Sequence, residues 1–206
     1  YYDDITLFDD DNNPGTVSYY QMKTNDESIS INTAISESWL EKLYAQLERP
    51  EWIVRELGFI TNCPLKIITT YKDEKGKNRR NKELLTSSRT PFTSFNKNTI
   101  EKIRKDIATK RGISVDEVDL SKFVHIRTTF SIPNHKEVVE NEMTNFLYGK
   151  YPKISIDSVK TIYATILELM TKRQQYELLP DNAPYEEVRR YKGVTKKDFS
   201  RIIETA

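Results

Sequence analysis

Three side chains near the N-terminus have the types and spacing that phosphodiester hydrolysis requires. Gln21 and Lys23 are two residues apart in the segment Tyr20-Gln21-Met22-Lys23-Thr24, so on a strand they point to the same face. Asp4 comes from a preceding β-rich segment. Oxygen ligands suit Mg²⁺, and a lysine stabilises the charge that develops on a phosphate. We predict Asp4, Gln21 and Lys23 as catalytic residues, with Asp4 and Gln21 as the metal ligands.

A predicted β-hairpin brings these residues together. Residues 4–9 and 16–23 are β-rich, and the Asp-Asp-Asn-Asn-Pro-Gly run at 10–15 between them is a dense turn signal. If Phe8 pairs with Val17, Asp4 lies opposite Gln21, whereas a one-residue slip puts Asp3 there instead. A simpler interpretation also stays open, in which Gln21 and Lys23 form only the solvent-exposed face of an antiparallel strand.

Further along, the patterns indicate a mixed α/β core. Ser36 is a candidate cap for a helix that carries Trp39 to Leu47, and the isoleucines of residues 100–107 predict a second helix, ended by Gly112. Residues 52–61, 65–71 and 123–130 are typical of strands, while residues 72–96 are polar and irregular. Since the chain opens directly in a strand, we expect that a preceding helix is missing.

The C-terminal part changes to a helical pattern. Asn134 with Glu137 resembles a capping box that opens a helix to about Leu147. An apolar stripe from Ile156 to Met170 predicts a long helix, and Thr195 is a candidate cap for a last one. We therefore predict a nuclease core over residues 1–132 and a helical extension over residues 133–206.

The charge balance limits where a nucleic acid can bind. The 206 residues contain 32 Lys and Arg against 31 Asp and Glu, so the net charge of +1 gives no global signature of nucleic-acid binding. Residues 72–82 are locally basic. We predict that this segment contacts the DNA backbone, although an ordinary solvated loop has the same composition; the candidate residues are Lys72, Lys75, Lys77, Arg79, Arg80 and Lys82.

Composition also excludes several classes of protein. The single cysteine, Cys63, excludes an internal disulfide and favours a reducing cytoplasm. The two histidines lack the spacing of zinc ligands, and there is no phosphate-binding glycine-rich motif. No apolar run approaches the ~18–20 residues that span a bilayer, so we expect no membrane partner.

Four short segments resemble one particular family. These are Tyr2-Asp3-Asp4-Ile5, Tyr19-Tyr20-Gln21-Met22-Lys23-Thr24, Trp39-Leu40-Glu41-Lys42-Leu43-Tyr44 and Leu57-Gly58-Phe59-Ile60-Thr61-Asn62. They look like the N-terminal domain of bacterial anti-phage effectors that cut double-stranded DNA. Some members, of the CBASS type, carry a C-terminal SAVED domain that senses cyclic oligonucleotides, and others act with a HerA-type ATPase.

The resemblance covers roughly residues 2–150. It implies a PD-(D/E)XK fold, Mg²⁺ dependence and activity as an oligomer. Asp4 then matches the metal-binding acid, Gln21 the usual acid position replaced by an amide, and Lys23 the catalytic lysine.

The resulting expectation is a cytoplasmic, Mg²⁺-dependent endonuclease that acts on double-stranded DNA in anti-phage defence. Such nucleases often add a glutamate from a preceding helix, which is absent from this sequence, so we expect the chain by itself to cut weakly. The alternative function is an inactive nuclease-like module for DNA binding or assembly. A third is an interaction domain unrelated to nucleic acid.

Overall fold

The computed structural model describes residues 5–10, 13–48, 51–72, 74–128, 135–174 and 183–206. The chain divides into two compact units, residues 2–131 and residues 132–206. The first unit is mixed α/β and the second is helical. The predicted fold class, a mixed-sheet core followed by a helical extension, is therefore confirmed.

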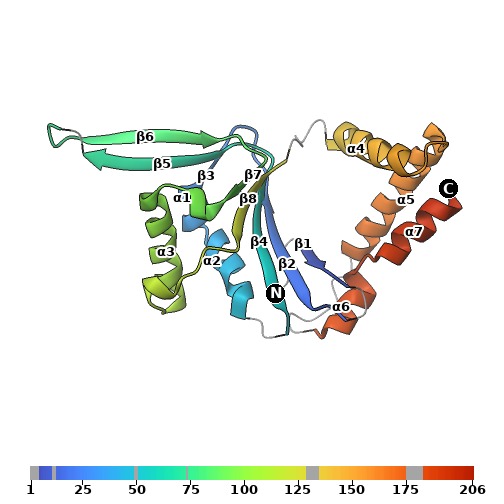
Figure 1. The fold of residues 1–206 in the computed structure, drawn as a ribbon, viewed down its shortest axis with the longest axis horizontal. Coiled ribbons are helices and arrows are strands. Elements are labelled where there is room, and N and C mark those ends of the chain that lie inside the picture. The colour runs from blue at the N-terminus through green and yellow to red at the C-terminus, as the bar shows by residue number, and fades with distance from the viewer. Residues whose placement is uncertain (1–4, 11–12, 49–50, 73, 129–134, 175–182) are drawn as a thin grey trace. The chain divides into compact units, whose positions relative to one another are not determined.

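A five-stranded mixed sheet forms the centre of the first unit (Figure 1). Its strands, in spatial order, are β1 (Ile5–Phe8), β2 (Thr16–Lys23), β4 (Ile53–Thr61), β8 (Phe123–Arg127) and β7 (Arg89–Pro91). The outer pairs β1–β2 and β7–β8 are antiparallel, while β2, β4 and β8 are parallel. The carboxyl ends of the three parallel strands therefore meet at one edge of the sheet.

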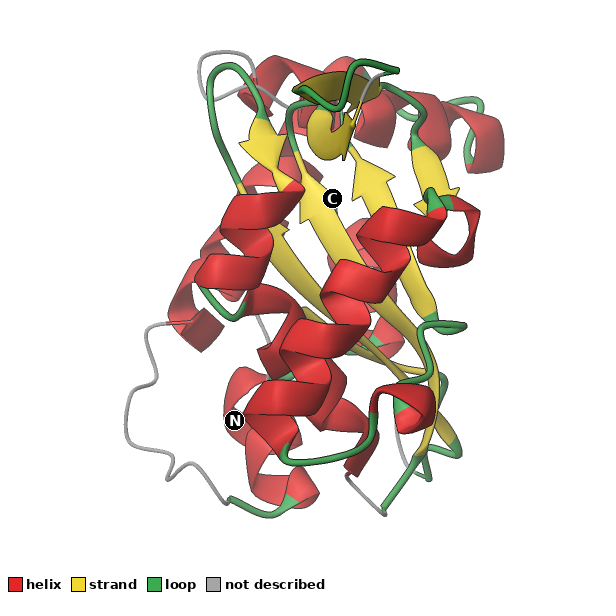
Figure 2. Ribbon diagram, turned by 90° about the vertical axis from the view of Figure 1, so that its left-hand side faces the viewer, coloured by secondary structure: helices red, strands yellow, loops and turns green. Residues whose placement is uncertain are grey.

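Helices cover one face of this sheet (Figure 2). They are α1 (Ile31–Ser36), α2 (Trp39–Tyr44) and α3 (Lys97–Arg111), with 3₁₀ turns at Ala45–Glu48, Phe92–Ser94 and Val115–Glu117. Leu40 and Leu43 of α2, Ile103 and Ile107 of α3 and Phe59 of β4 belong to one buried apolar cluster. Burial of this face, rather than helix propensity, stabilises such short helices.

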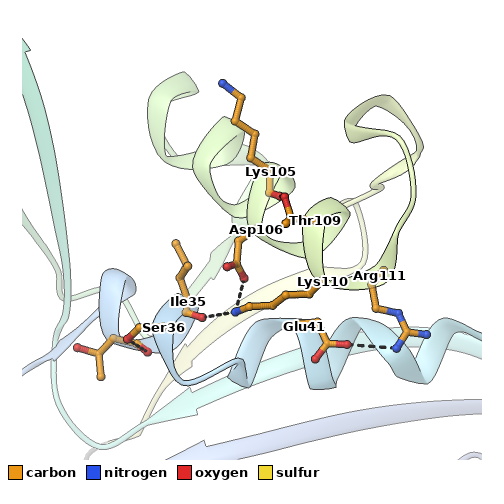
Figure 3. Close-up of polar contacts among 9 residues, drawn as sticks. Ile35, Ser36, Glu41, Lys105, Asp106, Thr109, Lys110 and Arg111 are labelled. Carbon is orange, nitrogen blue, oxygen red and sulfur yellow. Dashed lines mark hydrogen bonds and ion pairs between the residues drawn. The ribbon is translucent and has the colours of Figure 1, made fainter.

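Polar contacts at the end of α3 fix it against α1 and α2 (Figure 3). Lys110 Nζ donates to the Ile35 carbonyl at 2.8 Å and pairs with Asp106 at 2.9 Å. Arg111 Nη1 reaches Glu41 of α2 at 3.2 Å. The predicted end of α3 is confirmed, because Gly112 takes the left-handed conformation with φ 67°.

The helix predicted to begin at Ser36 is α2, which begins later, at Trp39 after the N-cap residue Ser38, and continues as a 3₁₀ turn to Glu48. The sequence did not predict α1, which begins at Ile31, where the Ser30 hydroxyl accepts a hydrogen bond from the Asn32 amide at 3.2 Å. Ser38, with φ 60°, then separates α1 from α2.

Residues 72–96 are not irregular as predicted. Most of them belong to β6 (Asn78–Leu85), β7 and the turn that follows. Antiparallel pairing joins β6 to β5 (Leu65–Lys72), which is parallel to the short β3 (Ile29–Ser30) in a second, three-stranded sheet. The basic segment is thus part of a long β-hairpin rather than a loop.

The helical unit contains α4 (His135–Lys150), α5 (Ile156–Gln174), α6 (Tyr185–Lys192) and α7 (Lys196–Thr205). Leu147, Val159, Ile162 and Ile202 form its buried core. The Thr195 cap is confirmed, since Thr195 and Asp198 form a capping box, whereas Asn134 lies outside the described residues. Sequence patterns did not predict α6, and α4 ends beyond Leu147. Within the described residues, no helix combines the length and apolar character that a bilayer crossing requires.

Gly58 offers a test of how tightly the sheet is packed. A Cβ atom at this position would lie 2.2 Å from Cδ1 of Tyr20, its partner on β2. Overpacking of this kind costs about 1–3 kcal/mol, so we expect Gly58→Ala to lower the free energy of unfolding by that amount in urea titrations. In a Tyr20→Ala background the same substitution should cost much less. An equal cost in both backgrounds would contradict the packing explanation.

Candidate active site

The β1–β2 hairpin has the register that the sequence predicted. Phe8 pairs with Val17, and the pairing continues to Ile5 opposite Tyr20. Asp9 closes the turn, because its Oδ1 accepts hydrogen bonds from the amides of Gly15 and Thr16, each at 3.0 Å. These hydrogen bonds hold the pKa of Asp9 below its usual value. Asp3 and Asp4 lie outside the described residues.

Gln21 is buried, so the interpretation of its side chain as part of a solvent-exposed face is wrong. Only 7% of its surface is exposed. Among the described residues, its Oε1 has no hydrogen-bond partner. A buried carbonyl oxygen without a donor costs about 1–3 kcal/mol. A metal cation is one kind of ligand that such a carbonyl oxygen binds.

Lys23 lies at the carboxyl end of β2, two residues after Gln21 and on the same face. Its Nζ is 5.2 Å from the centroid of the Trp39 ring, which belongs to α2. The Trp39 ring in turn lies 6.1 Å from that of Phe59. Since a cation is attracted to the face of an indole, Trp39 helps to orient the ammonium group. The sequence did not single out Trp39 for this role.

His125 and Thr61 form a buried polar pair on the strands that follow β2 in the sheet. The strand register aligns Gln21, Phe59 and His125 across β2, β4 and β8. The Thr61 hydroxyl donates to the Cys63 carbonyl at 2.7 Å and lies 2.9 Å from His125 Nε2. Because the hydroxyl has one proton, His125 must donate from Nε2.

The tautomer of His125 leaves a lone pair on Nδ1. No described residue hydrogen-bonds to this buried nitrogen. Burial, with a smaller contribution from Arg127, lowers the pKa of His125 to about 4. The ring is therefore neutral near pH 7. The sequence placed His125 correctly in a strand but gave no sign of this pairing, which depends on the parallel register of β4 and β8.

The segment after Lys23 is fixed to the end of β4. The Asn25 amide donates to Asn62 Oδ1 at 2.9 Å, and the Ile29 amide donates to the Pro64 carbonyl at 3.2 Å. Cys63 lies between these contacts as a buried free thiol, and burial raises its pKa. Asn62 and Pro64 thus fix the position of the residues that follow β2, and they take no part in the chemistry.

The predicted DNA-binding residues are placed together on the β5–β6 hairpin. Lys72 is the last residue of β5, Lys75 and Lys77 lie in the turn, and the other three lie on β6, namely Arg79, Arg80 and Lys82. Within the described part of the chain there is no cluster of three or more histidine, cysteine, aspartate or glutamate residues that could hold a metal. Gln21 and Lys23 are thus the predicted catalytic residues that the structure places together.

The mixed sheet with helices on one face defines the class as an α/β domain, and a buried amide followed by a lysine at the end of one parallel strand is its candidate site. Residues 1–173 match the model of the family described as Cap4, dsDNA endonuclease domain, so the chain belongs to this family. The match confirms the resemblance of the four segments. It extends beyond the first unit into α5.

One curated relative is the Lamassu protein LmuA of Bacillus cereus (strain VD014). It is 24% identical over 208 residues, which cover 99% of this chain and 54% of that protein. The chain therefore spans about half the length of this relative. No solved structure matches the chain.

The pKa of His125 predicts how stability depends on pH. The unfolded side chain titrates near 6.5 and the folded one near 4, so the stabilising effect is complete above pH 6.5 and is lost as the pH falls from 6.5 towards 4. The shift corresponds to about 3 kcal/mol. We expect urea titrations at pH 7 and pH 4 to show this extra loss in the natural protein but not in His125→Gln. Identical pH dependence of stability in the two proteins would disprove the assigned role of the His125 pKa.

Proposed function

We propose that this chain is the catalytic part of an Mg²⁺-dependent endonuclease of the PD-(D/E)XK type that hydrolyses double-stranded DNA. The observation that carries the proposal is the buried Oε1 of Gln21, which has no hydrogen-bond partner among the described residues and lies two residues before Lys23 on one strand face. Membership in a dsDNA endonuclease family supports the choice of substrate.

The described residues supply only part of the oxygen ligands that a hard divalent cation requires. Gln21 offers a neutral oxygen, and Mg²⁺ sites in proteins usually include a carboxylate. Continued by one residue beyond Ile5–Tyr20, the hairpin register would oppose Asp4 to Gln21, which is why we propose Asp4 as the acidic ligand. When bound, the cation polarises the phosphate and lowers the pKa of a coordinated water.

Lys23 is proposed to act on the phosphate directly. Its ammonium group stabilises the negative charge that develops on the phosphoryl oxygens, and it orients the attacking water. Trp39 restricts the positions of the Lys23 side chain and so reduces the entropy lost when the substrate binds. His125 lies in the same row of the sheet as Gln21, two strands away. Its neutral ring hydrogen-bonds to Thr61 and takes no proton near pH 7.

The substrate and setting follow from the same family. We propose that the basic segment 72–82 contacts the DNA backbone and that the protein acts in bacterial anti-phage defence, in keeping with its similarity to a Lamassu protein. An oligomer with a SAVED domain or a HerA-type ATPase remains our proposal for its assembly, and a reducing cytoplasm for its location.

The amide at position 21 also favours a second candidate, a nuclease-like module that binds DNA without cutting it. A neutral oxygen holds a divalent cation less strongly than a carboxylate does. Incubation of plasmid with Mg²⁺ and then with EDTA separates the two. Cutting only with the metal supports the enzyme, whereas salt-dependent binding without cutting supports the module.

Lys23→Ala tests the catalytic assignment. We expect at least a hundredfold loss of plasmid cleavage, because removal of one charge-stabilising group costs 10²–10³ in rate in other enzymes. The melting temperature should change little, since the cation–π contact contributes only about 0.5–1 kcal/mol. Lys105→Ala on α3, which removes an exposed lysine of the same unit, is the control and should cut normally. Full activity of Lys23→Ala would reject the assignment.

Gln21→Met separates a functional role from a structural one. Methionine has a similar shape and no buried carbonyl, so we expect the free energy of unfolding to stay equal or rise by about 1 kcal/mol. Plasmid cleavage should be lost, because the oxygen ligand is gone. Gln21→Glu should retain metal-dependent cutting. A destabilised Gln21→Met that still cuts DNA would show that the amide is structural.

A further inference from the structure

The β5–β6 hairpin has two faces of different chemistry. Direct partners across the two strands share a face, and faces alternate along each strand. Leu65 pairs with Leu85 and Ile67 with Glu83, and this face packs against the apolar core. The opposite face, which we call the outer face, carries Lys66, Ile68, Thr70, Leu84, Lys82 and Arg80.

The two faces carry different charges. The outer face holds three described basic residues, Lys66, Arg80 and Lys82, and no acidic residue. On the inner face Arg79 is accompanied by Glu83. Among the ion pairs of the described residues, none involves Lys66, Arg80 or Lys82. The outer face is therefore a one-sided basic strip whose charges are not neutralised by described residues.

The hairpin begins at the edge that carries the candidate active site. Three residues, Asn62 to Pro64, connect β4 to β5, and Thr61 is the register partner of Lys23. Arg127 of β8 fixes the other strand, since its Nη1 donates to the Thr86 carbonyl at 2.9 Å. Figure 1 shows β5 and β6 extending together beyond the five-stranded sheet. The strip thus leads away from the site along an arm that is held on both strands.

The dimensions of the arm suit a DNA duplex. Each strand has eight residues, or roughly 27 Å at ~3.4 Å per residue. A duplex rises ~3.4 Å per base pair along each strand, so the arm spans about eight base pairs. Arg80 and Lys82 are separated by about 6.8 Å along the strand. This spacing allows each side chain to contact a different phosphate.

We infer that the outer face of the β5–β6 hairpin binds the phosphate backbone of the substrate duplex on one side of the cleavage position. The inference rests on the proposed function, because it takes DNA as the substrate. It adds Lys66 to the binding residues and assigns contact to one face of the arm. Lysine and arginine bind phosphates independently of sequence, so the contact does not select bases.

A second copy of the chain is a poorer partner for the same arm. In the described three-stranded sheet β6 is an edge strand, which is a common place for strand pairing between molecules. Its sequence Asn-Arg-Arg-Asn-Lys is basic, and basic edges oppose such pairing. Two identical arms would bring like charges together, whereas a polyanion neutralises them.

The decisive experiment moves charge between faces without changing composition. In the variant Arg80→Asn, Asn81→Arg, Lys82→Glu, Glu83→Lys, both basic residues change to the inner face. Affinity for a labelled duplex is measured by fluorescence anisotropy in EDTA at several salt concentrations. We expect the log–log salt slope to fall by about 1.8 for two lost contacts, which is roughly 60-fold in affinity at 0.1 M salt.

Two controls accompany the charge-exchange variant. Arg80→Lys with Lys82→Arg keeps both charges on the outer face and should bind like the natural protein. Lys97→Gln with Lys105→Gln removes two positive charges from α3 and should leave the slope unchanged. Arg80→Gln with Lys82→Gln repeats the loss with a milder change at exposed positions, where substitutions usually cost within about 0.5 kcal/mol.

The outcomes separate this inference from the proposed function. If the natural protein neither binds nor cuts duplex DNA, the proposed function fails and the inference fails with it. If it cuts DNA and the charge-exchange variant binds with the same affinity and slope, only the inference about the outer face is overturned. A shallower slope in the exchange variant and in Arg80→Gln with Lys82→Gln, with both controls unchanged, supports the inference, and Mg²⁺-dependent cutting by the natural protein supports the proposed function.

Discussion

Phe59 lies in the middle of the parallel strands, between Gln21 on one side and His125 on the other. Its side chain is fully buried and contacts the rings of Trp39 and His125. Because a buried aromatic ring makes many close contacts, it leaves few positions open to its neighbours. The locations of the Gln21 amide, the His125 imidazole and, through Trp39, the Lys23 ammonium all depend on this packing.

The same packing leaves polar atoms unpaired. Neither Gln21 Oε1 nor His125 Nδ1 finds a partner among the described residues. Each unpaired buried atom costs about 1–3 kcal/mol, and a domain has only about 5–15 kcal/mol of net stability. A sheet that retains two such atoms, one on each side of Phe59, is thus less stable than a sheet with apolar side chains of the same shape at these positions. This cost is typical of functional sites, where a ligand supplies the missing partner.

Local signals were sufficient for part of this structure. The Pro-Gly turn, the helix end at Gly112 and the Thr195 cap each depend on residues close together in sequence, and all three were predicted. The alternation of β2 likewise placed Gln21 and Lys23 on one face. The burial of Gln21 was not predictable, because it depends on helices that cover that face. The contact between Thr61 and His125 joins strands 64 residues apart and needs their parallel register.

The strand β6 was missed because its sequence lacks apolar alternation. Hydrogen-bonded pairing with β5 makes this segment a strand. Leu85, which packs beside Leu65 against the core, determines which face of the strand points inward. With Leu85 turned inward, the period of two places Glu83 inward and Lys82 and Arg80 outward. A nearly neutral chain thereby acquires a basic surface that its net charge of +1 does not reveal. One apolar contact at the base of the hairpin determines which charges an incoming polyanion meets.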